Sequence, residues 1–207
     1  MKSSRWQPRL AALLCALVVS AGLLGLSSAP VWAAAGTVTE FPLPQHGTPF
    51  DITAGPDGNL WFTAGTGEVG RITSGGSIIE FALPTGASFP EGITAGPDGN
   101  LWFTESRGNK IGRITPAGLI TEFPLLSRCG KYLTCAPHGI TTGPNGNLWF
   151  TMENGNAIGS ISPSGSFAGG FSIPTASSVA EGITTGPDGN LWFTEERASK
   201  IGRFSTS

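Results

Sequence analysis

A nine-residue motif that recurs four times limits what this chain can fold into. GPDGNLWFT begins at Gly55, Gly96 and Gly186, and it appears as GPNGNLWFT at Gly143, so successive copies are 41, 47 and 43 residues apart. A period in the forties with several short strand signals per copy is typical of a propeller blade, whereas leucine-rich and helical repeats need periodicities that are absent here. We therefore expect an all-β protein, a β-propeller of four-stranded antiparallel blades.

The residue chemistry of one copy divides it into four strands. Residues 92–95 are small and suit the crowded axis, and a Pro-Asp-Gly turn connects them to residues 101–104, which are apolar or aromatic on both faces. Residues 110–115 form the third strand and residues 120–124 the fourth. Proline closes the fourth strand and marks it as an edge, because proline cannot donate to a central ladder. The fourth strand is therefore the outermost.

The two ends of the repeat region have complementary strand types. Residues 37–43 have the pattern of a fourth strand, and residues 200–204 have that of a third strand. Pairing the first segment onto the last blade would complete four blades and leave only short edges exposed. We expect this N-terminal strand to close the ring.

The first 35 residues have the three parts of a signal peptide. Lys2, Arg5 and Arg9 precede an apolar stretch over residues 10–26, and small residues follow at 33–35. A membrane anchor is the alternative, but the apolar run is short and interrupted by glycine and serine. We predict a signal peptide over residues 1–35, a single propeller domain of four repeats over residues 36–207, and a secreted, extracellular protein.

Charge and cysteine content follow from removing the signal. Nine Lys and Arg then stand against 14 Asp and Glu, which argues against nucleic acid and anionic membranes as partners. Cys129 and Cys135 remain as an even pair, which in an oxidising compartment favours a disulfide over a metal site or a reactive thiol. Their loop belongs to the insertion that lengthens one repeat step to 47 residues.

Aligning the repeats places one set of side chains just before the inner strand of each blade, around the axis. This set consists of Phe50, Glu91, His138 and Glu181. Carboxylates around one imidazole can hold magnesium or calcium through oxygen, or manganese or zinc with the imidazole. The alternative is structural: Glu91 and Glu181 as solvated turn residues, and His138 as a rim histidine capped by the backbone.

The pattern GITxGPDGNLWFTE, followed by NKIGRI and ITEFPLP, resembles the virginiamycin B lyases, or streptogramin lyases, through essentially the whole chain after the predicted signal. The resemblance implies antibiotic resistance by a carbon–oxygen lyase that opens a cyclic depsipeptide of the streptogramin B type by elimination. Members with this activity typically have seven blades, and this chain offers four.

The resemblance also assigns site residues. The Pro137-His138-Gly139 triplet matches the one that carries the family's general base, and residues 149–153 match the run that ends in a magnesium-binding glutamate, here Glu153. Ala136 replaces an acidic metal ligand, and Glu91 replaces a substrate-binding histidine. We therefore predict His138 as the catalytic base, and a magnesium ion, or another divalent metal, held by Glu153 with Glu91 and Glu181.

Two further hypotheses stand beside the lyase. One is a non-catalytic extracellular propeller that binds a glycan, a peptide or a cell-wall component. The other is an incomplete ring that assembles with another subunit, or a fragment of a larger propeller. The expected partner is a small cyclic peptide or another small molecule, and the protein is a monomer unless the ring is incomplete.

Overall fold

A computed structural model describes residues 36–45, 47–125 and 134–206 of the chain. All the described strands lie in one compact unit, Glu40–Ser207, and residues 36–39 belong to a separate unit. The predicted signal peptide over residues 1–35 and Cys129 lie outside the described residues. Over the described ranges, no helix is long and apolar enough to cross a membrane.

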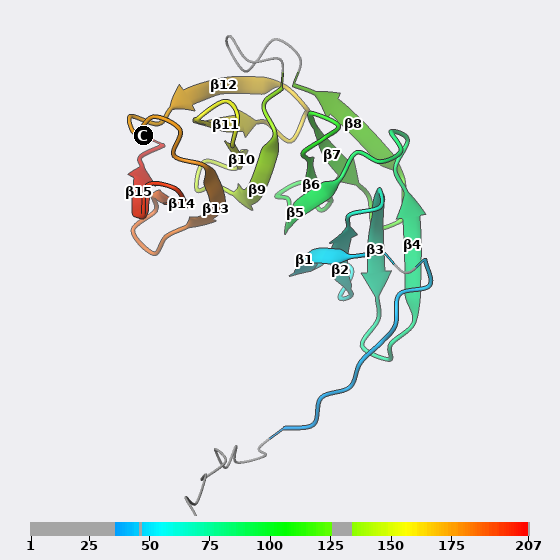
Figure 1. Cartoon of the computed structure of the whole chain (residues 1–207). Helices are drawn as coiled ribbons and strands as arrows, with labels where there is room; N and C mark the ends of the chain where they lie inside the picture. The colour runs from blue at the N-terminus through cyan, green and yellow to red at the C-terminus, as the bar shows by residue number, and fades with distance from the viewer. Residues whose placement is uncertain (1–35, 46, 126–133, 207) are drawn as a thin grey trace, which may run out of the picture. The chain divides into compact units, whose positions relative to one another are not determined.

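The second unit consists of antiparallel sheets whose strands are neighbours in chain order (Figure 1). This arrangement confirms the predicted class, an all-β propeller built from four blades. The first sheet contains β1 (Pro49–Ala54), β2 (Leu60–Ala64), β3 (Glu68–Ile72) and β4 (Ile78–Ala82), and the second contains β5 (Pro90–Ala95), β6 (Leu101–Glu105), β7 (Lys110–Ile114) and β8 (Ile120–Pro124). The third contains β9 (Pro137–Thr142), β10 (Leu148–Met152), β11 (Ala157–Ile161) and β12 (Phe167–Ser172), and the fourth β13 (Ala180–Thr185), β14 (Leu191–Glu195) and β15 (Lys200–Phe204).

The nine-residue motif that the four repeats share builds the hairpin between the first two strands of each sheet. In the second sheet, Asp98 Oδ1 accepts hydrogen bonds from the indole Nε1 of Trp102 (3.0 Å) and from the backbone of Asn100 (3.3 Å). Gly99 completes the turn at a φ of 75°, a region that favours glycine. The turn therefore satisfies the one polar atom of a tryptophan whose side chain is fully buried.

The second strand of each sheet supplies the core. Trp102 and Phe103 of β6 are fully buried, and the Phe103 ring lies directly over Gly112 of β7, where no Cβ would fit. Burial of an aromatic side chain contributes roughly 2–3 kcal/mol. The core thus lies between neighbouring sheets. The Phe103 ring can pack against the third strand because Gly112 has no side chain.

Neighbouring sheets are joined through their inner strands, since β1 packs on β5, β5 on β9, and β9 on β13. In each of the first three sheets, a threonine on the second strand donates its hydroxyl hydrogen to a backbone carbonyl of the next inner strand. Thr63 donates to Glu91 O (2.5 Å), Thr104 to His138 O (2.6 Å) and Thr151 to Glu181 O (2.7 Å). These bonds hold Glu91, His138 and Glu181 at equivalent heights on adjacent strands.

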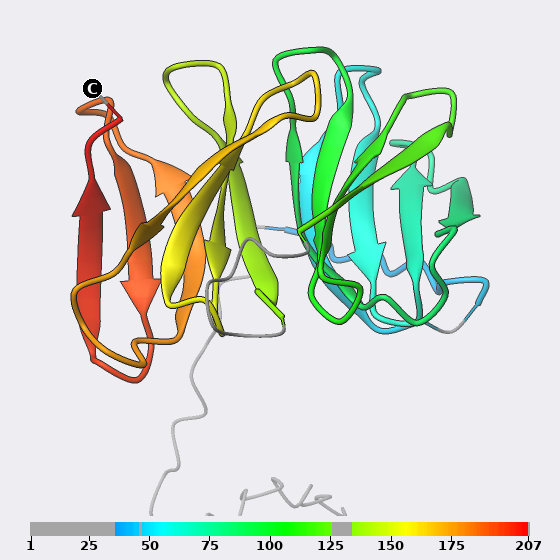
Figure 2. The ribbon, with the colours of Figure 1, turned by 90° about the horizontal axis from the view of Figure 1, so that it is seen from above.

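The predicted closing strand does not form. The last sheet has three strands, and residues 36–42 contain no strand. In Figure 2, β15 (red) is an edge of its sheet. Pairing would require the first and last sheets to pack together, and in the described part of the chain no packing comparable to that of the inner neighbours joins β13 to β1. The strand pattern does not encode the angle between sheets, which decides whether the two ends meet.

Candidate functional site

The inner strands bring three of the predicted site residues together. Glu91 lies on β5, His138 on β9 and Glu181 on β13, each as the second residue of its strand. This is the arrangement that the repeat alignment predicted. Each side chain belongs to a different sheet, so the site depends on the packing of three blades.

Glu91 and His138 form an ion pair across two sheets. The distance between His138 Nε2 and Glu91 Oε2 is 2.8 Å, and Ser106 donates its hydroxyl hydrogen to Glu91 Oε1 at 2.8 Å. The His138 side chain is 37% exposed and that of Glu91 is 14% exposed. The imidazole is therefore accessible to a ligand, while the carboxylate that holds it is largely covered.

This contact shifts the pKa values of both partners. Burial raises the pKa of Glu91, but hydrogen bonds from His138 and Ser106 and the positive charges of His138 and Arg107 outweigh it, so its pKa is lowered. For His138 the hydrogen bond to Glu91 is the largest influence, and it raises the pKa of the imidazole above 6.5 although burial opposes it. The pair is thus a carboxylate beside a histidine that holds its proton more tightly than usual.

Three further carboxyl groups, those of Glu181, Glu153 and Glu196, interact electrostatically with His138 or with one another. The pKa of Glu181 is raised by burial first, and then by a hydrogen bond with Glu196 and by the charges of Glu196 and Glu153, while His138 opposes the shift. The negative charges of Glu181 and Glu153 also contribute to the raised pKa of His138. His138 is consequently surrounded by acidic groups contributed by three sheets.

An open cavity of about 390 Å³ has Glu91, the carboxylate of the ion pair, on its wall. Its lining includes Glu91, Ser106, Arg107, Ala136, Glu153 and Asn154. Ala136 stands at the position that the resemblance assigns to an acidic metal ligand, and it lies on the cavity wall together with Glu153. The backbone N–H of Glu153 donates to the carbonyl of Ala136 at 3.1 Å. A cavity of this size is in the usual range for small-molecule sites.

The acidic groups around His138 are the residues predicted to bind a metal ion. Both carboxylate oxygens of Glu91 are engaged, one by His138 and one by Ser106. Among the residues that the structure describes, no three His, Cys, Asp or Glu side chains are arranged to hold an ion. The magnesium site predicted at Glu153, Glu91 and Glu181 stays a prediction.

Ser106 and Arg107 are site residues that the sequence analysis missed. Ser106 has the same repeat position as Glu153 and Glu196, directly after the second strand, so the alignment contained the signal. Arg107 stacks over Phe89, with its guanidinium carbon 4.2 Å from the ring centroid. This cation–π contact holds a positive charge at the cavity.

Cys135, one half of the predicted disulfide, lies beside the same site, since Asn154 on the cavity wall donates its N–H to the Cys135 carbonyl at 3.2 Å. Cys135 is fully buried, and its N–H donates to Asn109 Oδ1 at 2.7 Å. Cys129 lies outside the described residues, so the pairing of Cys129 with Cys135 stays a prediction.

These observations define the class of protein: it is a β-propeller in which a glutamate and a histidine on adjacent inner strands form an ion pair. A family model described as the virginiamycin B lyase family matches residues 31–130 and 131–207. The chain belongs to the virginiamycin B lyase family. No curated protein matched the sequence.

Solved structures agree with this assignment. The selenomethionine form of virginiamycin B lyase from Staphylococcus aureus is 45% identical, with a TM-score of 0.77 over 83% of this chain and 57% of that one. A catalytically inactive variant of the S. aureus enzyme with quinupristin is 44% identical, with a TM-score of 0.74 over 81% and 55%. A streptogramin B lyase is 42% identical, with a TM-score of 0.75 over 83% and 56%. This chain spans a little over half the length of these lyases.

Proposed function

We propose that this protein is a carbon–oxygen lyase that opens a cyclic depsipeptide of the streptogramin B type by elimination. The observation that carries the proposal is the ion pair between His138 and Glu91 beside an open cavity. Family membership supports the reaction class, and the variant solved with quinupristin supports the substrate class.

His138 has the surroundings of a general base. In the neutral imidazole, Nε2–H donates to Glu91, which leaves the lone pair of Nδ1 to accept a proton from substrate. The imidazolium that forms is stabilised by the carboxylates of Glu91, Glu181 and Glu153, which raise its pKa. Glu91, fixed in turn by Ser106, acts as a positioning residue for the ring.

The elimination balances without water. The base removes a proton from a carbon adjacent to a carbonyl, and the electron pair of that C–H bond forms a carbon–carbon double bond. The C–O bond on the neighbouring carbon breaks, and the ester oxygen leaves as a carboxylate. The guanidinium of Arg107, on the wall of the same cavity, supplies positive charge for that leaving group.

Magnesium binding is a separate part of the proposal, and it rests on the resemblance to the family rather than on the geometry of the site. A bound divalent ion would stabilise the negative charge that develops on the substrate carbonyl. We expect the carboxylate of Glu153 to be a ligand of this ion. The role of His138 as base does not depend on it.

Quinupristin incubated with the full chain in ¹⁸O-labelled water tests the reaction. We expect a linear product that has the mass of the substrate and carries no label, because elimination only rearranges the atoms of the substrate. His138→Ala should lower kcat at least 100-fold, the low end for a lost general base. The matched control is His46→Ala at the chain's other histidine, which should keep full activity.

Two results would reject the proposal. One is labelled product, which would mean hydrolysis. The other is intact substrate with magnesium, manganese or calcium present, which would favour the non-catalytic binding propeller. Loss of activity on chelation, reversed by added magnesium, is the result that the metal prediction requires.

A further inference from the structure

The chain builds the same sheet-to-sheet interface three times within itself, and it exposes the two halves of a fourth. One half is the outer face of the last sheet, and the other is the outer face of the first sheet. Large apolar side chains are exposed on both, with Ile201 66% exposed on the last sheet and Ile52 58% and Phe50 50% exposed on the first. These fractions contrast with the fully buried Trp102 and Phe103 of the second sheet.

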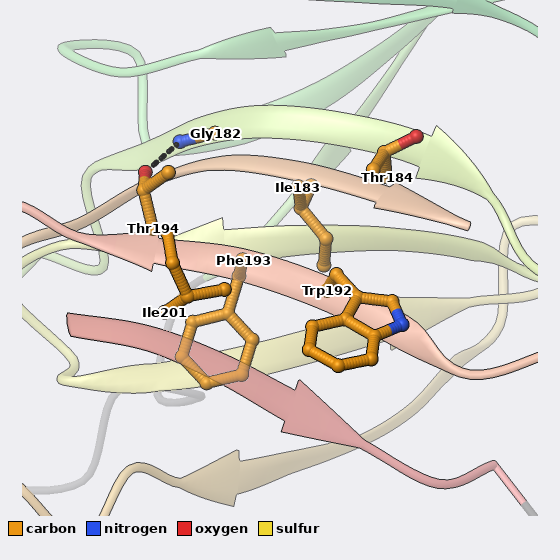
Figure 3. Close-up of a pocket in the computed structure, with 7 residues that line it drawn as sticks. All are labelled: Gly182, Ile183, Thr184, Trp192, Phe193, Thr194 and Ile201. Carbon is orange, nitrogen blue, oxygen red and sulfur yellow. Dashed lines mark hydrogen bonds between the residues drawn. The ribbon is translucent and has the colours of Figure 1, made fainter. Parts of the chain in front are cut away.

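The face of the last sheet has the donor half of the interface. It carries a groove of about 430 Å³ whose lining includes Ile183, Phe193, Thr194 and Ile201 (Figure 3). Thr194 is the repeat counterpart of the threonines that donate to a carbonyl of the next inner strand, and here it is exposed. Its hydroxyl oxygen accepts from Gly182 N at 3.0 Å, so its hydrogen is oriented by the same local bond as in Thr104, which accepts from Gly92 N.

The face of the first sheet has the acceptor half. Phe50 is the repeat counterpart of Glu91, His138 and Glu181, whose carbonyls receive the threonine hydroxyls. Beside it lies an apolar groove of about 320 Å³ lined by residues that include Phe41, Phe50, Ile52 and Phe62. Thr194 and the Phe50 carbonyl are therefore complementary halves of one repeated contact.

The segment before the first sheet is already placed as the outer strand of a preceding sheet. The Phe41 ring lies on Gly76 of the first sheet, as the rings of Phe81 and Phe123 on β4 and β8 lie on Gly118 and Gly165 of the following sheets. Gln45 N donates to Glu80 Oε2 (3.1 Å), as Thr85 N donates to Glu122 Oε1 (2.9 Å) one repeat later. In the described structure the last sheet lacks such an outer strand.

We propose that these two faces bind a second copy of this chain head to tail. The three-stranded sheet β13–β15 would then take residues 40–43 of the partner as its fourth strand. In the complete sheets Phe81 is opposite Val69 and Phe123 is opposite Ile111, so Phe41 of the partner subunit is placed opposite Ile201. Lys200 would meet Glu40 of the partner subunit, as Lys110 meets Glu122.

Two chains form a closed ring when each chain uses both of its exposed faces. A head-to-tail interface made twice around a two-fold axis gives a ring of two chains and leaves neither face exposed. Two chains of four sheets make eight, which is within the size range of known propellers. A second copy is the occupant because both complementary halves are present on the same chain.

The mass of the full chain in solution, measured by sedimentation equilibrium across a range of concentrations, tests the proposal. We expect twice the mass of one chain, and we expect Ile201→Asp to halve it by placing a charge against an apolar ring. Leu119→Asp is the matched control, because Leu119 is 69% exposed between β7 and β8 and belongs to neither face. A monomeric parent chain, or an Ile201→Asp variant that stays dimeric, would overturn the proposal.

A cysteine pair tests the register and the direction of the contact. With Phe41→Cys and Ile201→Cys in one chain, oxidation should join two chains, seen as a doubled mass on a gel without reductant. Each single variant controls for the native cysteines. A disulfide that forms within one chain would instead show that the chain closes on itself, which contradicts the proposal.

Discussion

At the scale of single residues, Glu91 changes the electrostatics of the site from the family pattern. The resemblance assigns a substrate-binding histidine to this position, and here a carboxylate lies 2.8 Å from the imidazole of His138. A negative charge so close favours the protonated ring and opposes its use as a base at low pH. The same carboxylate contacts the ring, so Glu91 both orients the imidazole and shifts its pKa.

Replacing Glu91 with Gln should lower the pKa of His138, because it removes the hydrogen-bonded charge that is the main cause of the raised value. NMR titration measures this directly, since the chain has only two histidines. As the base must be neutral, the acid limb of the pH–activity profile should move to lower pH. In the parent protein, the ion pair adds to the free energy of unfolding below pH 6.5, and this contribution is lost as the pH rises through the raised pKa of His138. Glu91→Gln should lack this contribution.

Glu153→Gln is the control for that variant, because Glu153 acts on His138 through charge alone and has the smallest of the named effects. It should lower the pKa of His138 less than Glu91→Gln does. An unchanged pKa in Glu91→Gln would show that the 2.8 Å contact is not maintained in solution.

The sequence predicted which residues gather at the site but not how they are used. Glu91, His138 and Glu181 share one repeat position, and the repeat position determines where along its inner strand each residue lies. The orientation of Glu91 depends on Ser106, which comes from another strand end, and repeat alignment contains no information on side-chain direction. The contacts of Glu91 with His138 and Ser106 could therefore not be predicted from the alignment.

At the scale of elements, the strand predictions were close because strands and hairpins are specified locally. The four strands expected at 92–95, 101–104, 110–115 and 120–124 correspond to β5, β6, β7 and β8 within two residues at each end. The closing strand at residues 37–43 was wrong, because its partner is far away in the chain. Local pattern specifies a strand, but the packing angle between sheets decides which edge that strand can reach.

The hairpin turn allows a test of that local specification. Asp98→Ala should lower the free energy of unfolding by about 1–3 kcal/mol, because it leaves the indole N–H of buried Trp102 without its acceptor. Asp98→Asn should cost less than about 1 kcal/mol, since Asn145 accepts from Trp149 at the same 3.0 Å in the third sheet. Chemical denaturation measures both values. Equal losses in the two variants would mean that the carboxylate charge matters and the indole bond does not.

At the scale of the whole propeller unit, stability is expected to be uneven, because each sheet packs on its neighbours in chain order. The second strands of the two central sheets, β6 and β10, are buried along their whole length. In the last sheet β14 includes an exposed residue and a half-buried one. An end sheet therefore has one covered face where a central sheet has two.

Hydrogen exchange should reveal this difference and its dependence on association. In dilute protein, the amides of β14 should exchange faster than those of β6 and β10, because local opening of an end sheet uncovers less apolar surface. As the concentration rises, a second copy covers the end face, so protection of β14 should approach that of the central strands. Ile201→Asp should keep fast exchange in β14 at every concentration. Equal protection of the three strands in dilute protein would show that the sheets open only as one cooperative unit, whatever their exposure.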